Sequence, residues 1–359
     1  MNLFVEGRMI STSTHNGLSR YSVGMIEALH AIHPLTVLVS DTSQLHFFKQ
    51  PIPYLLVPPP SLHSQRLVTK KLNQAGADVL YSPTQFFTSG PRRFKVAMTL
   101  HDTIGFVTKG SLRGSYTTQI STFQRVQWKL FHLTKHAQRT ILNQANVVLT
   151  VSNLSKQHIL EAKLTKRPVE VIYNGVAHFS PLDRSDVKKQ LLYVGTTFGY
   201  KNVPLLVKAI NLLPDYKLII ASNVDSYARN QLTSFAKNPD QLVFCNGVSE
   251  EEYRSLLSSS QALVTASKHE GFGLPLIEAQ ASGVPIIVSD IPIFHEVASE
   301  NSALYFSPDK PETLVEQVRQ LETNPTLQHD LIAAGIVNSK RFQWDESAKK
   351  LLSILTALT

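Results

Sequence analysis

The chain has 359 residues, of which 43% are apolar, and a formal net charge of +8 at pH 7. This length suits two domains, each with its own hydrophobic core. The apolar runs are shorter than the roughly 20 residues of a membrane span. The N-terminus lacks the basic region followed by an apolar stretch that is typical of a secretory signal. Cys245 is the only cysteine, which excludes an internal disulfide. We therefore expect a cytoplasmic protein.

Positive charge is concentrated in the first half of the chain. Residues 1–183 carry 19 Lys and Arg against 8 Asp and Glu, whereas residues 184–359 carry 16 against 19. A basic half indicates an anionic partner, such as a membrane surface, a lipid-linked pyrophosphate or nucleic acid. A solvated basic surface without a partner is the alternative. Nucleic acid is disfavoured, because the sequence has no zinc-ligand spacing, RNP-like segment or helix-turn-helix pattern.

Strands and helices are predicted to alternate along the first half. The expected strands are 2–6, 35–40, 54–57, 78–82, 95–100, 147–151 and 169–172, and the expected helices are 17–32, 62–75, 118–145 and 153–163. Such alternation favours an α/β fold with parallel sheets.

The same alternation restarts after a polar segment, 174–189, which we interpret as a linker. Strands are expected at 191–194, 217–221, 241–244, 262–265, 285–288 and 303–305, with helices between them and a final helix near 343–358. The sequence thus predicts two Rossmann-like domains, 1–183 and 184–342, followed by a C-terminal helix at 343–359. We expect the ligand to bind between the two domains.

The segment KHEGFGLPLIEA, residues 268–279, is the most informative part of the chain. Pro275 fits the first turn of a helix, and the glycines before it allow close approach of backbone N–H groups to a ligand. A helix N-terminus favours an anion. Glu270 precedes this start and Glu278 lies one turn inside the helix. Two carboxylates around an anion site suit a nucleotide sugar, which has hydroxyls at both ends and phosphates in the middle.

These residues resemble the E-x7-E signature of retaining nucleotide-sugar glycosyltransferases of family 4, which have the GT-B architecture. The resemblance implies that Glu270 contacts the donor sugar and that Glu278 holds the ribose hydroxyls. It also implies that the loop backbone approaches the sugar and phosphates, and that the C-terminal helix crosses back to the first domain. The remaining donor-binding residues implied by this motif are Gly271, Phe272, Gly273 and Leu274. The alternative is a pair of solvated glutamates around an ordinary helix start.

A second phosphate-binding element is predicted after strand 191–194. Gly195 ends this strand, and Lys201 precedes an apolar helix, from which a lysine can reach a phosphate. The family pattern here is V-G-R-x4-K, and Gly195 and Lys201 match it. Thr196 replaces the usual arginine, so Lys201 must carry more of the charge, or Thr197 must donate a hydroxyl hydrogen bond.

Two segments of the first half also match the family. Gly17 and Arg20 match a G-x-G-R-Y junction between loop and helix, with Ser19 at the second glycine. Gly17 is expected to approach the leaving phosphate. His101 directly follows strand 95–100, beside Asp102, and the resemblance places such a histidine at the donor sugar or the acceptor. A histidine beside a carboxylate can be held in one tautomer.

Residues 123–135 mix basic and aromatic side chains at helical spacing. Such a helix can lie on an anionic membrane. A helix packed on the first sheet, with an exposed basic face, is the alternative.

Together these features predict a retaining hexosyltransferase that uses a nucleoside diphosphate sugar and acts on a hydroxyl of a glycan or glycolipid. The expected catalytic residues are His101, Glu270 and Lys201. We predict no metal and no cofactor, because no Asp-x-Asp lies where a metal clamp would be needed. The stretches HDTIG and SDIP resemble polysaccharide mannosyltransferases, which favours GDP-mannose over a UDP-hexose as donor.

Four alternatives remain. A nucleotide-sugar epimerase shares the architecture, although the segment EGFGLPLIEA is not expected in it. A phosphorylase would need a pyridoxal lysine, and a dinucleotide oxidoreductase would need G-x-G-x-x-G after a first strand. A non-catalytic sugar-nucleotide-binding subunit is favoured only by the departures at Ser19 and Thr196.

Overall fold

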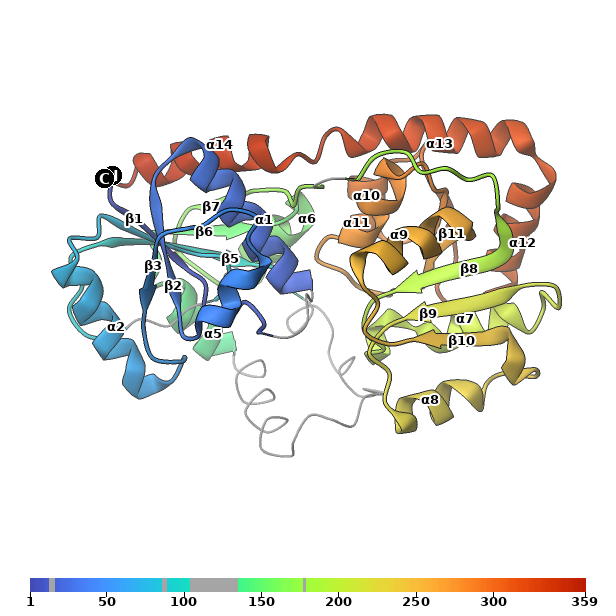
Figure 1. The fold of residues 1–359 in the computed structure, drawn as a ribbon, viewed down its shortest axis with the longest axis horizontal. Helices are drawn as coiled ribbons and strands as arrows, with labels where there is room; N and C mark the ends of the chain where they lie inside the picture. The colour runs from blue at the N-terminus through green and yellow to red at the C-terminus, as the bar shows by residue number, and fades with distance from the viewer. Residues whose placement is uncertain (13–16, 86–88, 104–134, 177–178) are drawn as a thin grey trace. The chain divides into compact units, whose positions relative to one another are not determined.

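The computed structural model describes residues 1–12, 17–85, 89–103, 135–176 and 179–359 (Figure 1). These residues form two compact units. The first contains both chain ends, with the described residues up to position 176 and the segment Phe342–Thr359. The second contains the described residues from position 179 to Arg341.

A sheet of seven parallel strands, counted over the described residues, forms the centre of the first unit, in the order β3-β2-β1-β4-β5-β6-β7. Helices cover parallel strands on both faces, so such strands are apolar along their whole length. The strands are β1 (Leu3–Glu6), β2 (Leu35–Val39), β3 (Tyr54–Leu56), β4 (Val79–Ser82), β5 (Lys95–Leu100), β6 (Val147–Thr150) and β7 (Val169–Val171). Every residue of β1, β4 and β6 is buried.

Helices pack around this sheet and complete its core. They are α1 (Gly17–Ile32), α2 (Leu62–Gln74), α5 (Lys135–Leu142), α6 (Asn153–Glu161) and α14 (Trp344–Thr356), with a short 3-10 helix, η1 (Thr42–Phe47). One apolar cluster joins strand residues such as Leu80 and Met98 to Leu72 of α2, Leu142 of α5 and Ile159 of α6. Helix α14 packs along α1, and Figure 1 shows it beside that helix.

The second unit is built around six parallel strands, again counted over the described residues, in the order β10-β9-β8-β11-β12-β13. The strands are β8 (Lys188–Val194), β9 (Lys217–Ala221), β10 (Leu242–Cys245), β11 (Ser260–Thr265), β12 (Ile286–Ser289) and β13 (Leu304–Phe306). The helices are α7 (Val203–Ile210), α8 (Ser226–Thr233), α9 (Glu250–Ser259), α10 (Leu274–Ala281), α11 (Pro292–Ala298), α12 (Pro311–Thr323) and α13 (Pro325–Ser339), with η2 (Gly199–Lys201) and η3 (Pro239–Gln241). The carboxyl ends of β8 and β11 lead into the loops before α7 and α10.

Most predicted elements are present, and the differences have identifiable causes. Strand β8 begins at Lys188 rather than at 191, because its exposed first residues pair with neighbouring strands although they do not enter the core. Gln241 was expected in a strand but ends η3, where its amide donates to the carbonyls of Leu213 and Tyr216, both at 2.8 Å. The predicted helix 118–145 lies outside the described residues as far as position 134, and its described part, α5, ends at Leu142.

Among the described residues, no helix combines the length and apolar character needed to cross a bilayer.

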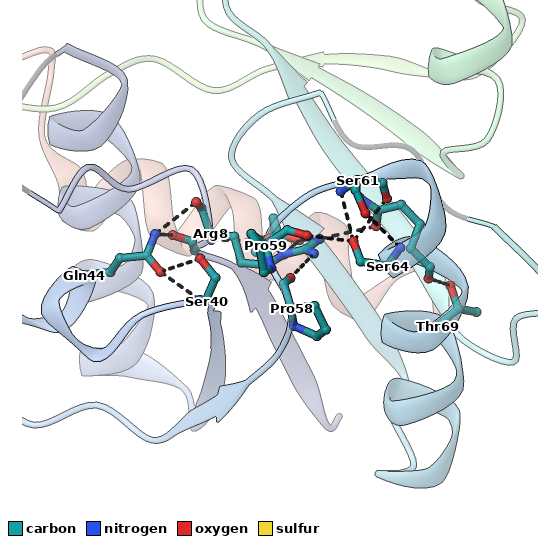
Figure 2. A network of polar contacts seen from close by, with 11 residues as sticks. Arg8, Ser40, Gln44, Pro58, Pro59, Ser61, Ser64 and Thr69 are labelled. Atoms are coloured by element: carbon teal, nitrogen blue, oxygen red, sulfur yellow. Dashed lines mark hydrogen bonds and ion pairs between the residues drawn. The ribbon is translucent and has the colours of Figure 1, made fainter.

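A buried ion pair between Arg8 and Glu6 fixes the loop after β1, and Figure 2 shows the network of polar contacts that includes Arg8. The guanidinium of Arg8 donates through Nε to Glu6 Oε1 at 2.8 Å and through a terminal nitrogen to Glu6 Oε2 at 2.7 Å. Both side chains are almost fully buried, at 0% and 1% exposed. Arg8 also donates to the carbonyl of Pro58 at 3.0 Å and to Gln65 Oε1 at 3.3 Å. The pair therefore joins β1 to the loop before α2 and to α2 itself.

Gln44 ties the same loop to η1. Its amide nitrogen donates to the carbonyls of Arg8 and Ile10 at 3.0 and 2.7 Å, and its amide oxygen accepts from the backbone N–H of Ser40 at 2.8 Å. This network therefore fixes the loop after β1 from Arg8 to Ile10.

We predict that Arg8→Met lowers the free energy of unfolding by about 3–5 kcal/mol, because the carboxylate of Glu6 is left buried without its partner. The double variant Glu6→Leu/Arg8→Met removes both charges and should lose less than the single variant. Lys349→Met, which breaks an exposed pair with Glu346 in the same unit, should cost less than about 1 kcal/mol. Urea denaturation measures the free energy of unfolding of all three variants. Equal losses for Arg8→Met and Lys349→Met would contradict a stabilising role of the buried Arg8–Glu6 pair.

Candidate functional site

The predicted site residues divide between the two units. Gly17, Arg20 and His101 belong to the first unit, and the others belong to the second. The second-unit group is described first, because its members contact one another directly.

Helix α10 begins where the sequence predicted. Gly273 is the N-cap with φ +108°, a left-handed conformation that favours glycine. A Cβ on Gly273 would lie 3.2 Å from Leu276 Cδ1 and 3.3 Å from Phe294 Cε1. Pro275 occupies the first turn. Phe272 is 4% exposed, so its ring anchors the loop in the protein interior. The loop thus presents mainly backbone at a helix N-terminus, which carries partial positive charge.

Glu270 and Lys201 form a close ion pair beside this helix start. Lys201 Nζ lies 2.5 Å from Glu270 Oε1, and the two side chains are 18% and 12% exposed. Ser267, just after β11, donates to the same oxygen at 2.7 Å. The backbone N–H of Lys268 donates to the carbonyl of Tyr200 at 2.8 Å, which joins the two loops. The structure therefore brings together two of the three predicted catalytic residues.

The backbone around Lys201 is fixed by its neighbour Asn202. Asn202 is left-handed, with φ 54° and ψ 34°, and connects η2 to α7. Its side-chain amide donates to the carbonyl of Pro308 at 2.7 Å. Asparagine adopts this conformation more readily than most residues, so Asn202 suits the position between Lys201 and the apolar helix α7.

Gly195 and the two threonines after it line the end of β8. Gly195 has φ +142°, and a Cβ there would lie 3.3 Å from the hydroxyl of Tyr193. That hydroxyl donates to the carbonyl of Thr196 at 2.5 Å. Burial raises the pKa of Tyr193 well above its usual value, and the negative charge of Glu270 raises it further. Tyr193 is therefore a neutral hydroxyl that supports this loop, a residue that sequence reasoning missed.

Thr196 and Thr197 differ in exposure. Thr196 is exposed, whereas Thr197 is 0% exposed and its hydroxyl oxygen has no hydrogen-bond partner within the described part of the chain. Of the two, Thr197 is the one with an unused buried hydroxyl, and unused buried polar groups are uncommon.

Glu278 is buried on α10 and held by α9. Its Oε2 accepts a hydrogen bond from the hydroxyl of Tyr253 at 2.9 Å, and both residues are 5% exposed. The ring of Tyr253 lies edge-on to Phe179, with centroids 6.1 Å apart. The alternative of two solvated glutamates is therefore wrong, since both carboxylates are largely buried and hydrogen-bonded. Sequence reasoning did not find Tyr253.

His101 follows β5 in the first unit, where a backbone carbonyl holds it. Its Nε2 lies 2.6 Å from the carbonyl oxygen of Pro83. A carbonyl only accepts, so Nε2 carries the proton, and Nδ1 keeps its lone pair in the neutral ring. Burial lowers the pKa of His101, opposed by this hydrogen bond and by the charge of Asp102. The ring is thus neutral at pH 7, and Pro83 is the partner that fixes its tautomer.

Gly17 is the exposed first residue of α1, and Arg20 is half-buried one turn later. Ser19, which stands at the family's second glycine, is 0% exposed and accepts a hydrogen bond from the N–H of Ser11 at 2.9 Å. Ser19, which replaces the glycine of the family pattern, thus links α1 to the preceding loop. The predicted membrane helix 123–135 falls almost entirely outside the described residues.

Two parallel sheets covered by helices, one in each unit, are the architecture of glycosyltransferases of the GT-B class. The model of the family described as "Glycosyltransferase Family 4" matches residues 15–178, and that described as "Glycosyl transferases group 1" matches residues 177–337.

Curated relatives and solved structures agree with this class. The chain is 30% identical over 324 residues to the O-antigen chain mannosyltransferase RfbU of Salmonella typhimurium, covering 86% of this chain and 88% of that protein. It is 28% identical over 187 residues, 49% of each chain, to a GDP-mannose:cellobiosyl-diphosphopolyprenol alpha-mannosyltransferase of Xanthomonas oryzae pv. oryzae. A glycosyltransferase structure from Rickettsia africae has the same fold, with a TM-score of 0.73, 18% identity and coverage of 99% and 98%. The chain therefore belongs to the glycosyltransferase family whose two domain models match residues 15–178 and 177–337.

Neutralising the two members of the ion pair should change the affinity for a nucleoside diphosphate in opposite directions. Lys201→Gln removes a cation and should weaken binding by about tenfold or more. Glu270→Gln removes the carboxylate that competes with the diphosphate for Lys201, and should tighten binding by about two- to fivefold. Isothermal titration calorimetry with GDP, in EDTA, measures both.

Lys268→Gln is the matched control, because Lys268 lies near the site but pairs with Asp309 and is 46% exposed. The affinity of Lys268→Gln for GDP should equal that of the parent. Changes of the same sign for Lys201→Gln and Glu270→Gln would count against a site organised around this pair.

Proposed function

We propose that the protein is a retaining mannosyltransferase that transfers mannose from GDP-mannose to a hydroxyl of a glycan or lipid-linked acceptor in cell-surface polysaccharide synthesis. The observation that carries this proposal is the contact between Lys201 and Glu270 at the start of α10. A cation for the diphosphate and an acceptor for sugar hydroxyls are fixed within hydrogen-bond distance of each other, beside a helix N-terminus.

Each part of the second unit then has a role toward the donor. Lys201 and the backbone of Gly195 and Gly271 through Leu274 would hold the diphosphate and stabilise the charge that develops as it leaves, a term worth about 10²–10³ in rate for one donor. Glu270 would accept hydrogen bonds from the sugar. Glu278, positioned by Tyr253, would accept from the ribose. Thr197 would offer its hydroxyl in place of the missing arginine.

In the first unit, His101 would face the donor sugar or the acceptor. Its neutral Nδ1 would accept a hydrogen bond from a hydroxyl, while Nε2 stays bound to Pro83. Gly17 and Arg20 would contribute to the leaving phosphate. The first unit is thus proposed to bind the acceptor and the second to bind the donor. As in the family, we propose front-side attack with the leaving phosphate as base.

The donor identity rests on the relatives. One aligned relative is named for GDP-mannose and another for mannosyl transfer in O-antigen synthesis. We propose that no metal is required, because Lys201 and backbone N–H groups meet the diphosphate charge. An epimerase or a non-catalytic nucleotide-binding subunit would also bind the nucleotide, but neither would transfer mannose to an acceptor hydroxyl.

We further propose that the first unit contacts an anionic membrane surface. Residues 42–160 contain 14 Lys and Arg and only two acidic residues, Asp78 and Asp102. Helix α2 has no acidic residue and exposes Arg66, Leu67 and Lys70. Leu67 of α2 is 44% exposed, and Tyr54 and Leu56 of the preceding strand β3 are 49% and 52% exposed. Exposed basic and apolar side chains on consecutive elements of the chain suit a lipid interface.

GDP-mannose is expected to raise the thermal unfolding midpoint of the protein by a few degrees in EDTA, more than UDP-glucose or UDP-galactose at equal concentration, because ligands stabilise the state that they bind. Glu278→Ala should abolish this shift. The parent should bind GDP more tightly than 2′-deoxy-GDP, because Glu278 is proposed to bind the ribose hydroxyls, and Glu278→Ala should lose this difference. Glu312→Ala, an exposed glutamate at the start of α12, is the control and should behave like the parent. Equal shifts in the parent and Glu278→Ala would show that Glu278 does not bind the donor. A larger shift with a UDP-hexose would show that the donor is not GDP-mannose.

Flotation with vesicles containing phosphatidylserine, at low salt, tests the membrane proposal. The parent should float, and Arg66→Glu/Lys70→Glu should reduce binding by more than about tenfold, since each basic residue near the surface contributes about 1 kcal/mol. Lys217→Glu/Lys237→Glu makes the same charge change on exposed residues of the second unit. If both double variants bind like the parent, α2 is not the contact surface.

A further inference from the structure

The imidazole of His101 is held on one side by the ring of Tyr21. The two ring centroids are 4.4 Å apart and the planes meet at 84°, an edge-to-face contact. Together with the hydrogen bond from Nε2 to Pro83, this contact restricts both the rotation of the imidazole and its access to water. The orientation of Nδ1 therefore depends on where Tyr21 lies.

Tyr21 is itself immobilised in the interior of the first unit. It is 1% exposed, and its hydroxyl lies 2.9 Å from the hydroxyl of Tyr81 on β4 and 3.4 Å from Thr99 Oγ1 on β5. Burial raises the pKa of Tyr21, so the hydroxyl stays protonated. These contacts fix the hydroxyl end of the side chain and leave the ring to be packed from the other side.

Trp344, the first residue of α14, packs against that ring. The centroids of Tyr21 and Trp344 are 5.6 Å apart at 66°, and Trp344 is 9% exposed. The indole lies against two glycines. A Cβ on Gly24 of α1 would come within 2.6 Å of Trp344 Cε2, and one on Gly175 within 2.5 Å of its ring. A side chain at either position would therefore displace the indole.

Two further bonds hold the start of α14 in place. The hydroxyl of Ser347 donates to the carbonyl of Tyr173 at 2.8 Å, and the N–H of Val176 donates to the carbonyl of Phe342 at 2.8 Å. The indole is thus a fixed support at the end of a series of three rings, from Trp344 through Tyr21 to His101.

We propose that Trp344 is a positioning residue, which acts through Tyr21 to fix the orientation of the His101 imidazole. This inference rests on the proposed function only for the role of His101 in transfer. The alternative is that Trp344 merely anchors α14. The two differ in one respect: a residue that only anchors the helix has no specific effect on the imidazole.

NMR of protein labelled with ¹⁵N-histidine distinguishes a positioning role of Trp344 from a role in anchoring α14 alone. His101→Gln is used to assign the His101 signals. In the parent, His101 should show the tautomer protonated at Nε2. Trp344→Leu should raise the His101 pKa by about one unit, because a displaced Tyr21 ring lets water reach the imidazole. Trp344→Phe keeps an aromatic ring and should give a smaller rise. Leu355→Ala, a buried α14 position 11 residues further along, is the control for lost packing and should leave the His101 signals unchanged.

The kinetic arm uses GDP-mannose and acceptor. Trp344→Phe should lower kcat by about tenfold with the donor KM within about twofold of the parent, since small displacements of a reacting group affect turnover strongly. Unchanged His101 signals in folded Trp344→Phe, or equal changes in Leu355→Ala, would overturn the proposal. Should no donor be turned over, the proposed function fails, while the NMR arm still decides the role of Trp344.

Discussion

The pairing of Lys201 with Glu270 is the interaction on which the proposed site depends. The pair lies at the start of α10, where Gly273 adopts a left-handed conformation and Phe272 is buried. Because both charges are largely withdrawn from water, each is stabilised mainly by the other, and Glu270 also accepts a hydrogen bond from Ser267. An anionic ligand that takes Lys201 must leave Glu270 free for a new donor, and sugar hydroxyls are suitable donors. Binding of the two ends of one ligand is thereby linked.

The two carboxylates of the motif are positioned in different ways. Glu270 takes part in an ion pair and stays near the surface, whereas Glu278 lies in the interior and accepts from the hydroxyl of Tyr253. A charge-paired group can exchange partners when a ligand arrives, while a group held by a buried neutral hydroxyl is oriented in advance. These environments suit a sugar contact that forms during the reaction and a ribose contact that is fixed beforehand.

Much of the fold and part of the site could be predicted from the sequence. Helix α1 and strands β5 and β9 have the predicted limits, because apolar periodicity and local turn residues determine them. The start of α10 was predictable for the same reason, since Gly273 and Pro275 act within a few residues. Glu270 and Lys201 were each predicted as ligand-binding residues, but their contact was not, because they lie 69 residues apart and no local pattern links them. Tyr253 and Trp344 were missed, since their partners are distant in sequence and no local pattern marks them.

A crystal structure with GDP-mannose bound tests the central claim most directly. The account predicts that a diphosphate oxygen lies within hydrogen-bond distance of Lys201 Nζ at the start of α10. It also predicts that Glu270 accepts from a mannose hydroxyl rather than from Lys201. A bound nucleotide sugar that leaves the Lys201–Glu270 pair intact, or that lies away from α10, would contradict the account.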